Sequence, residues 1–418
     1  MNYKYFNLPN CDLYVIKTDK FKTIDFKIFL YDEIKKEDVT WRNCLMDTLI
    51  YATNKYKTKK ELAIKAIDLY SVYLSASNMR FGNYIISKIG ISLLNPKYTE
   101  ADMLDKSLEL LHDVIFDPYV ENGSFNKEYL NLIKKELKVD RETIAENSRT
   151  YANLKLFETM DINAPYAIDC YSDISILDTI DEQNLYQYYK KFMKQNRAFA
   201  IMVGDIDEKE ITKYMKKYFS FENNQQLTKP IIYEHNKVRQ RARIVVEESK
   251  YQQSKLAVAL KTKDLTTFEY RYVLNIYNAI LGGTADSKLM KVIREKYSLA
   301  YYVASGLHKA DNLLIINSGI DSKNFKKTIS LLKKLIKEMN EGNFSIDEIN
   351  KSKIEYINAF DEALETADGM IDILLGKILF NIDDVEVRKQ EILKVSKEDI
   401  MKIGSKIHLD TIFLLKGE

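Results

Sequence analysis

A pair of matching segments, half a chain apart, constrains the fold of this protein more than any other sequence feature. The apolar run RAFAIMVGD (Arg197–Asp205) matches DTIFLLKGE (Asp410–Glu418), and each run ends in a glycine followed by an acid. Gly204 and Gly417 are separated by 417 − 204 = 213 residues, about half of the 418-residue chain. A repeat of this length predicts a duplicated domain rather than a solenoid unit.

Two further matches keep the same order along the chain. ILDTIDEQNLYQYYKKF from Ile176 pairs with ILKVSKEDIMKIGSKI from Ile392. FNKEYLNLIKKELKVDRET from Phe125 resembles FSIDEINKSKIEYINAFDEA from Phe344. A loose alignment of two unrelated α+β stretches is the alternative explanation, and the shared order argues against it.

Each half opens on a strand pattern followed by a long helical pattern. Strands are predicted at Ile24–Leu30 and Ser254–Lys261, and helices at about Thr40–Thr53 and Thr267–Leu281. Strands and helices mix throughout, so we predict an α+β protein of two domains, each an antiparallel-rich sheet with packed helices.

The polar segment ENNQQLTKPIIYEHNKVRQRA separates the two halves. It contains Pro230 and has no helical period, which is typical of a linker. The predicted division is therefore an N-terminal domain at 1–221, a linker at 222–242 and a C-terminal domain at 243–418.

Charge and cysteine usage limit the class of protein. There are 63 basic and 61 acidic residues, which gives no basis for nucleic acid or an anionic membrane as a partner. The three cysteines are far apart and odd in number, which favours free thiols in a reducing compartment. No window has the length and apolarity of a signal peptide or a membrane span, so we expect a cytoplasmic protein.

The stretch LGGTADSKLMKVIREKYSLAYYVAS (Leu281–Ser305) predicts a glycine turn, a short helix and a strand. Gly282 and Gly283 allow close backbone approach and positive φ in the turn. Capping of the helix is assigned to Asp286 or Ser287. Its buried stripe is expected to consist of Leu289, Val292 and Ile293.

Two polar side chains of this stretch suit the binding of a peptide. Arg294 falls near the helix end and Tyr301 on the following strand, with a turn at Tyr297–Ser298 between them. A tyrosine hydroxyl can stabilise the charge that develops on a scissile carbonyl, and a guanidinium can hold a backbone carbonyl or carboxylate. The alternative is structural, with Arg294 paired to Glu295 and Tyr301 half in the core.

The full string GG-x3-S-x-L-x4-REK-x2-LAYYV resembles the second-half signature of the insulinase/pitrilysin-like (inverzincin) zinc metallopeptidase family. This resemblance covers nearly the whole chain and favours the first interpretation. It implies two insulinase-type domains that form half of a clamshell. It also implies substrate binding by Arg294, Tyr301, Gly282 and Gly283.

The first half of such a chain should carry the zinc motif HxxEH, and this chain cannot. Its histidines are at positions 112, 235, 308 and 408, so no two lie within one helical turn. Aligned by its helix, the motif falls on Cys44-Leu45-Met46-Asp47-Thr48. The family's later glutamate ligand corresponds to Glu142 or Glu136.

Each replacement removes a function of the zinc site. Thr48 is a poor zinc ligand, Asp47 is one methylene shorter than glutamate, and Cys44 alone cannot replace two imidazoles. A new metal site on Cys44, Asp47 and Glu142 is the alternative. A buried cysteine that packs as a small hydrophobe and a solvated Glu142 are the commoner arrangements, so we predict no metal in this chain.

The segment SASNMR (Ser75–Arg80) lies where active members of the family place an edge strand beside the metal. An edge of this kind can bind an extended peptide through backbone hydrogen bonds. Peptide binding along this strand is therefore a further expectation.

The resemblance implies a non-catalytic, substrate-binding subunit of a heterodimeric zinc metalloendopeptidase. It is similar to the inactive members of paired bacterial peptidases and of the mitochondrial processing peptidase. The expected partners are a catalytic paralogue with HxxEH, which holds the zinc, and a peptide substrate. The alternatives are a structural scaffold and a homodimeric peptide-binding protein with no proteolytic role.

Overall fold

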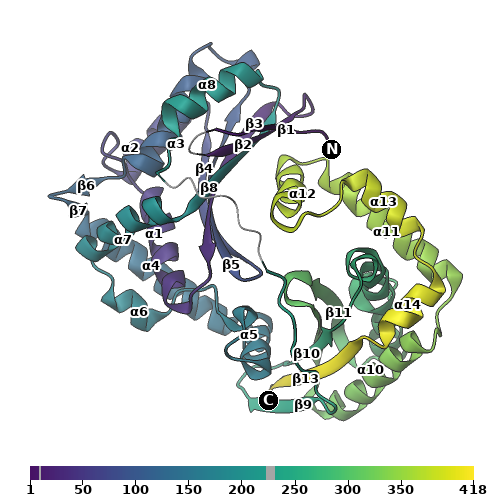
Figure 1. Cartoon of the computed structure of the whole chain (residues 1–418). Coiled ribbons are helices and arrows are strands. Elements are labelled where there is room, and N and C mark those ends of the chain that lie inside the picture. Colours follow the sequence, from purple (N-terminus) through teal and green to yellow (C-terminus); the bar gives the residue numbers. More distant parts are fainter. Residues whose placement is uncertain (9–10, 223–230) are drawn as a thin grey trace. The chain divides into compact units, whose positions relative to one another are not determined.

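The computed structural model of the chain describes residues 1–8, 11–222 and 231–418 (Figure 1). It divides into two compact units. Unit 1 comprises Met1–Glu142, Ala363–Phe380 and the described part of Asp169–Pro230. Unit 2 comprises Thr143–Ile168, Ile231–Glu362 and Asn381–Glu418.

Unit 1 is built on a six-stranded sheet in the order β1-β2-β8-β3-β5-β4. The β2–β8 pair is parallel and the other pairs are antiparallel. A small hairpin of β6 (Val120–Glu121) and β7 (Ser124–Phe125) lies outside the sheet. The strands of the sheet are β1 (Lys4–Phe6), β2 (Asp12–Lys17), β3 (Thr23–Glu33), β4 (Tyr73–Phe81), β5 (Tyr84–Leu94) and β8 (Arg197–Gly204).

Unit 2 is built on a five-stranded sheet in the order β11-β12-β10-β13-β9, in which the β13–β9 pair is parallel. Its strands are β9 (Arg243–Glu248), β10 (Ser254–Thr262), β11 (Ala300–His308), β12 (Leu313–Ile320) and β13 (Ile407–Lys416). Reversed, this order is β9-β13-β10-β12-β11, which matches β2-β8-β3-β5-β4 strand for strand. The duplication predicted from the sequence is confirmed at the level of topology, and so is the α+β class.

The helices follow the same repeated order in the two halves of the sequence. In the first half they are α1 (Lys36–Leu49), α2 (Lys59–Asp68), α3 (Met103–Phe116), α4 (Lys127–Glu146), α5 (Ser148–Met160), α6 (Ile174–Thr179), α7 (Glu182–Gln195) and α8 (Glu208–Tyr218). In the second they are the π-helical η3 (Glu269–Val273), α9 (Leu274–Asn278), the π-helical η4 (Ala279–Gly283), the π-helical η5 (Met290–Lys296), α10 (Phe325–Asn340), α11 (Ile346–Ala363), α12 (Ala367–Phe380), α13 (Val385–Leu393) and α14 (Lys397–Gly404). Short 3₁₀ turns connect other elements at Pro96–Tyr98, Pro165–Ala167, Lys309–Asp311 and Ser322–Asn324.

The central strand β3 is buried on both faces. On one face Phe26, Ile28 and Leu30 join the main core of unit 1, which α1, α3, α7 and α8 cover. On the other face Phe29 and Tyr31 join a second apolar cluster. A sheet that is apolar on both sides needs helices on both sides to exclude water.

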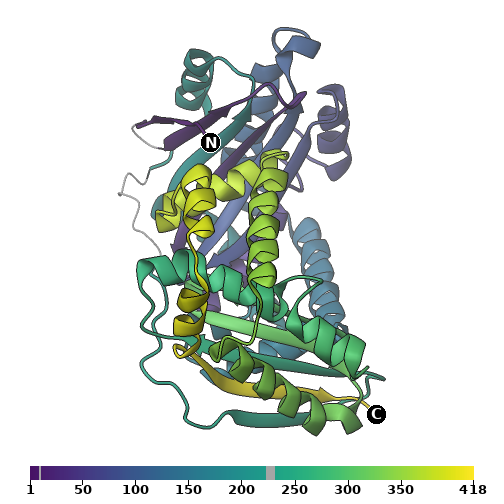
Figure 2. The same ribbon diagram turned by 90° about the vertical axis from the view of Figure 1, so that its right-hand side faces the viewer.

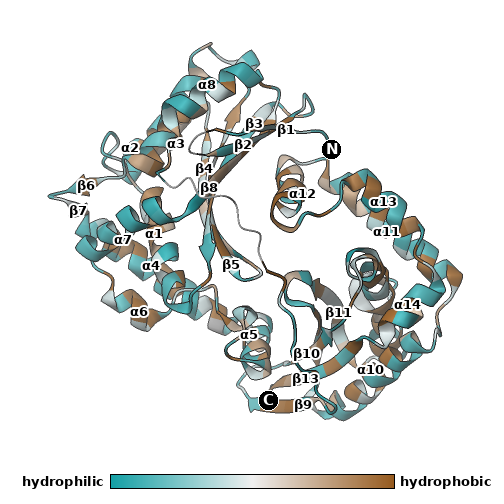
Figure 3. Cartoon of the chain, viewed as in Figure 1, coloured by the Kyte–Doolittle hydropathy of each residue, from teal (hydrophilic) through white to brown (hydrophobic). Residues whose placement is uncertain are grey.

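Helix α12 supplies the cover for that second cluster, although it belongs to the second half of the sequence. Met370, Ile371, Leu374, Leu375 and Leu379 are buried against the β3 and β8 side chains. Figures 1 and 2 show α12, in yellow-green, beside the purple strands of the N-terminal sheet. Figure 3 shows the helix largely in the brown of apolar residues. The Lys27 ammonium, buried on this face, pairs with Asp368 near the start of α12.

Unit 2 uses a helix from the first half in the same way. Ala152, Leu156 and Met160 of α5 pack on a cluster with strand residues that include Ala257 and Phe413. Helices α5 and α12 occupy equivalent places in the repeat, directly after α4 and α11. The two halves of the sequence therefore exchange one helix each.

The exchange explains where the units differ from the division at 1–221, 222–242 and 243–418. Residues 143–168 belong to unit 2 and residues 363–380 to unit 1, because α5 and α12 pack away from their own halves. Residues 223–230 of the predicted linker lie outside the described residues. The rest of it, 231–242, has no regular structure, and Tyr233 and His235 hydrogen-bond to the backbone of Ala310 and Asp311 in unit 2.

Helix α1 begins and ends about four residues earlier than the predicted Thr40–Thr53. It stops at Leu49 because the backbone beyond it pairs elsewhere. Ala52 accepts a hydrogen bond from the Tyr119 amide, and Thr53 forms a bridge with Pro118. Across the part of the chain that the structure describes, no helix has the length and apolarity needed to span a bilayer.

The contribution of α12 to unit 1 can be measured with Leu374, which is fully buried. We expect Leu374→Ala to lower the free energy of unfolding by about 2–5 kcal/mol, because it leaves a cavity beneath the sheet. Urea denaturation of the full chain measures this value. Lys216→Ala, at an exposed position of α8 in the same unit, is the control and should change stability by less than about 0.5 kcal/mol. Equal stabilities of the two variants would contradict the packing described for α12.

Candidate functional site

The degenerate zinc motif lies on α1 of unit 1, with its first and last residues turned into the protein. Cys44 is fully buried, and burial raises the pKa of its thiol to about 12, with a further contribution from Asp47. Thr48 is also buried, and its hydroxyl donates a hydrogen bond to the Cys44 carbonyl oxygen at 2.7 Å. At neutral pH the thiol is therefore protonated, and the hydroxyl is engaged by its own helix.

Asp47 has acidic neighbours on α4. Partial burial raises the pKa of this carboxyl to about 6, and the charges of Asp140 and Glu136 act in the same direction, while Lys59 opposes them. Glu142, which aligns with the family's later ligand, is exposed on the same helix and is not among the groups that shift the pKa of Asp47. Asp140 was missed; its spacing of four residues from Glu136 places both on one helix face.

These donors do not suit Zn²⁺. A structural or catalytic zinc site takes deprotonated thiolate, neutral imidazole or carboxylate, usually three or four together. Here the single thiol is fully buried, the hydroxyl is a poor ligand that bonds to its own helix, and the other acidic groups are carboxylates. Among the described residues, no group of three or more His, Cys, Asp or Glu side chains is placed to hold a metal ion.

A buried polar network fixes α1 on the sheet and was not anticipated. The Arg42 guanidinium is buried and donates to Asp38 (2.6 Å), Asn196 (2.7 Å) and Ser87 (3.2 Å). The Ser87 hydroxyl in turn donates to the side chain of Asn78 on β4 at 2.6 Å. Because every step is a hydrogen bond to a buried or half-buried group, the network holds α1 and β4 in a defined relation.

The second motif is organised by its two glycines. A Cβ on Gly282 would lie 2.5 Å from the Leu289 side chain and 2.7 Å from the Ser305 hydroxyl, and one on Gly283 would lie 2.6 Å from the Asn278 amide nitrogen. The predicted close approach is therefore present. The predicted positive φ is wrong, since neither glycine is in the left-handed region. Close packing, against Leu289 and the β11 residue Ser305 at Gly282 and against Asn278 of α9 at Gly283, requires glycine here rather than turn geometry.

Arg294 lies on η5, where the backbone is π-helical, a rare conformation that is frequent at functional sites. Leu289 and Ile293 are fully buried and Val292 partly, as predicted. Ser287 lies before the helix with a buried hydroxyl that has no partner in the described chain, and Asp286 pairs with Lys291, so neither side chain makes the predicted cap.

The turn expected at Tyr297–Ser298 is present. Ser298 has a left-handed φ of 50°, its amide donates to the Arg294 carbonyl oxygen at 3.1 Å, and the Leu299 amide donates to the Ile293 carbonyl oxygen at 2.9 Å. These bonds fix the path from the helix into β11. The Arg294 side chain is exposed, and neither Glu295 nor any other described group pairs with it.

Tyr301 occupies a β-bulge. Ala300 is opposite Ile320 and Tyr302 is opposite Gly319 of β12, so Tyr301 between them has no counterpart. A bulge of this kind re-aims a side chain and is common beside active sites. Tyr301 is 64% exposed, which contradicts the alternative of a tyrosine half in the core.

Its neighbour Tyr302 has a structural role. The ring packs on Gly319, where a Cβ would approach it to 2.7 Å, and the Arg149 and Lys255 cations lie 5.5 and 5.4 Å from its centroid. Cation–π contacts of this kind hold the ring in place. The strand is thereby anchored through Tyr302 while Tyr301 projects into solvent.

Strand β4, which contains the predicted edge segment Ser75–Arg80, is the last strand of the unit 1 sheet. It is the repeat counterpart of β11, the last strand of unit 2. Both are preceded by residues in the left-handed conformation, Tyr70 and Ser71 before β4 and Ser298 before β11. The edge position predicted for Ser75–Arg80 is confirmed, and peptide binding along it stays a prediction.

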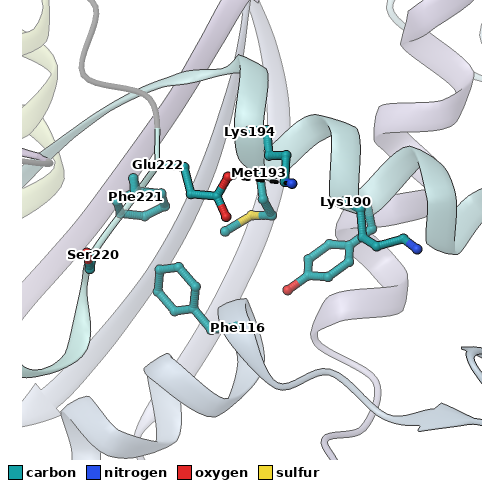
Figure 4. Close-up of a pocket in the computed structure, with 8 residues that line it drawn as sticks. Phe116, Lys190, Met193, Lys194, Ser220, Phe221 and Glu222 are labelled. Atoms are coloured by element: carbon teal, nitrogen blue, oxygen red, sulfur yellow. Dashed lines mark ion pairs between the residues drawn. The ribbon is translucent and has the colours of Figure 1, made fainter.

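A pocket of about 190 Å³ lies elsewhere in unit 1 (Figure 4). Apolar side chains, among them Phe116, Met193 and Phe221, surround it, and an ion pair of 3.7 Å joins Lys194 and Glu222 at its side. Its volume is below the roughly 300–1,000 Å³ of ordinary small-molecule sites. None of the residues of either motif lines it.

The requirement for glycine at position 282 gives a direct test of the motif's packing. We expect Gly282→Ala to destabilise the protein by about 1–3 kcal/mol, because the added methyl overlaps Leu289 and Ser305. Gly306→Ala on β11 is the matched control, since its methyl would meet nothing within 4 Å. Thermal unfolding of both variants measures the difference, and a neutral Gly282→Ala would disprove the close approach.

The raised pKa of Asp47 predicts a pH-dependent effect of Asp47→Asn. The unfolded carboxyl ionises near pH 4 and the folded one near pH 6, so ionisation penalises the native state increasingly between these values and constantly above them. The asparagine variant should equal the wild type below pH 4. Above pH 6 it should be more stable by about 1–2 kcal/mol, allowing for solvent screening. Denaturant unfolding at pH 4 and pH 8 provides the comparison, and a stability difference that is the same at both values would refute the shift.

Comparison with known proteins agrees with this arrangement. The family model described as "Peptidase M16 inactive domain" matches residues 179–356. A Bacillus subtilis (strain 168) protein named "Probable inactive metalloprotease YmfF" is 30% identical over 407 residues, which cover 97% of this chain and 95% of that protein.

Two crystal structures share the fold along its full length. A conserved protein from Enterococcus faecalis V583 has a TM-score of 0.91 at 24% identity, covering 100% of this chain and 99% of that one. The peptidase M16 inactive domain from Pseudomonas fluorescens has a TM-score of 0.77 at 16% identity, with the same coverage of both chains. The chain described here therefore belongs to the peptidase M16 family, the insulinase-like family that its second-half motif resembles, as a member without the HxxEH motif.

Proposed function

We propose that this chain is the non-catalytic, substrate-binding subunit of a heterodimeric zinc metalloendopeptidase. In this proposal the chain forms one half of a clamshell and contributes Arg294 and Tyr301 to the active site of a catalytic paralogue. The paralogue carries HxxEH and the zinc. A place in the cytoplasm is part of the proposal and is supported by the odd number and wide spacing of the cysteines, Cys11, Cys44 and Cys170.

The bulged, exposed position of Tyr301 is the observation that carries the proposal. A phenol with 64% exposure on a strand anchored by its buried neighbours has no packing role within the described chain. Arg294 likewise has no described partner, yet η5 holds it in a rare helical conformation. Polar side chains that are exposed on unusual backbone conformations and have no partner in the described chain favour contact with another molecule.

The chemistry of these two groups matches what a peptidase needs beside its metal. A tyrosine hydroxyl donates a hydrogen bond to the oxyanion that forms when water adds to a peptide carbonyl. An arginine fork binds a carbonyl or carboxylate of the substrate in two-point fashion. The α1 residues that replace HxxEH supply no metal ligand set, which supports a non-catalytic role for this chain.

Reconstitution with an HxxEH-bearing paralogue from the same organism tests the proposal. The two chains are expected to co-purify as a one-to-one complex that cleaves peptides only when both are present. Tyr301→Phe should lower kcat of the complex by about 10²-fold, because it removes one transition-state donor. Arg294→Ala should raise KM if the arginine binds the ground and transition states equally.

Matched controls separate these effects from structural damage. Tyr302→Phe removes a buried hydroxyl that has no partner in the described part of the chain, and Lys291→Ala removes a cation from the helix of Arg294. Both should retain wild-type kinetics. Full activity in the Tyr301 and Arg294 variants would assign the motif a structural role. A chain that binds no paralogue would instead favour a scaffold or a homodimeric peptide-binding protein.

A further inference from the structure

The two sheets differ at one edge. In unit 1, strand β2 pairs with β8 on one side and is covered on the other by β1. Its repeat counterpart in unit 2 is β9, which pairs with β13 and has no second neighbour among the described strands. The duplicated fold thus has a guarded edge in one unit and an open edge in the other.

The open edge is apolar at its centre. Ile244 and Val246 are 50% and 49% exposed on one face of β9. On the opposite face Val245 packs in the cluster with α5, and Glu247 accepts a hydrogen bond from the Tyr151 hydroxyl at 2.7 Å. Natural proteins usually protect such an edge with a lysine, a proline or a bulge, and the run Ile244–Val246 has none of these.

The direction of the free backbone groups follows from the strand's pairing. The Ser249 amide donates to the Lys416 carbonyl oxygen of β13 at 2.8 Å. Because backbone groups alternate along a strand, odd-numbered residues of β9 face β13 and even-numbered residues face outward. Ile244, Val246 and Glu248 therefore offer their N–H and C=O groups to an added strand.

We infer that β9 pairs antiparallel with β9 of a second copy of this chain. In an antiparallel pair, the residues whose backbone N–H and C=O groups point outward must lie opposite one another. Even-numbered residues of one copy therefore pair with even-numbered residues of the other. One such register places Val245 on the two-fold axis opposite itself and Ile244 opposite the partner's Val246. Arg243 then lies opposite the partner's Glu247, twice in the symmetric pair.

This register is complementary in every position of the strand's centre. Its hydrogen-bonded pairs join exposed apolar side chains, and its flanking pairs join opposite charges across the interface. A symmetric arrangement repeats each contact, so one short sequence, RIVVEE, supplies both sides. The self-complementarity of charge and hydrophobicity favours a second copy over an unrelated peptide.

This contact goes beyond the proposed function and uses a different surface. Strand β9 and strand β11, which carries Tyr301, are the opposite edges of the unit 2 sheet. Binding of a paralogue through the Arg294/Tyr301 side and self-association through β9 can therefore be measured and can fail separately.

A cysteine on the two-fold axis tests the register. In the non-hydrogen-bonded pair that Val245 would form, Cα atoms lie about 4.5 Å apart, within the range of a disulfide. Full-length Val245→Cys, in a background in which partly exposed Cys170 is replaced by serine, should oxidise to a covalent dimer. Non-reducing electrophoresis and mass spectrometry identify the disulfide that joins the introduced thiols of the two copies.

Ile244→Cys in the same background is the matched control. This position is equally open on the edge but lies opposite the partner's residue 246 rather than its own copy. It should form few homodimers alone and should cross-link when mixed with Val246→Cys. Cross-linking of all single variants at the same rate would indicate random collision and overturn the register.

Sedimentation of the protein without cysteine substitutions tests the contact itself. The wild type should dimerise with increasing concentration, and Val246→Lys should weaken the dimer by about tenfold or more by placing two charges on the shared edge. Arg243→Glu should weaken it through repulsion by the partner's Glu247, and Arg243→Glu combined with Glu247→Arg should restore it. A monomeric wild type at all concentrations, or a dimer that is indifferent to these changes, would refute the inference.

Discussion

One face of each sheet in this protein is covered by a helix that comes from the other half of the sequence. The sheets are apolar on both faces, and the helices of one half suffice for one face of its own sheet. The other face is covered by α12 in unit 1 and by α5 in unit 2. Burial of these apolar faces is the main favourable term in folding. The halves are therefore similar in topology but not independent in stability.

The two motifs of the chain are placed in opposite ways within that shared framework. On α1 the residues that replace HxxEH turn inward, as a protonated thiol and a hydroxyl bonded to its own helix. On η5 and β11 the motif residues turn outward. Ile293 and Val303 are buried, whereas the Arg294 and Tyr301 side chains are exposed. The same fold thus buries Cys44 and Thr48 of the degenerate zinc motif and exposes Arg294 and Tyr301 of the second-half motif.

The parts of this structure that depend on local patterns could be predicted from the sequence. The repeat, the central strands, the Gly282–Gly283 packing and the turn before Leu299 are of this kind. The helix exchange could not be predicted, because an apolar helix such as α12 does not indicate which sheet it covers. The bulge at Tyr301 depends on pairing with β12, and the position of Asp140 beside Asp47 depends on how α4 packs. The positive φ assigned to the glycines was wrong because a glycine can be required by a neighbour's volume alone.

The exchange of helices also sets an order of events during synthesis on the ribosome. The strand of the unit 1 sheet that is synthesised last, β8, ends at Gly204, but helix α12, which covers the sheet's second face, ends at Phe380, which is 380 − 204 = 176 residues later. At a translation rate of roughly 5–20 residues per second, one apolar face of the nascent sheet stays uncovered for about 9–35 seconds. The first half of the chain is thus an exposed intermediate during translation, and chaperones that shield apolar surface would act in this interval.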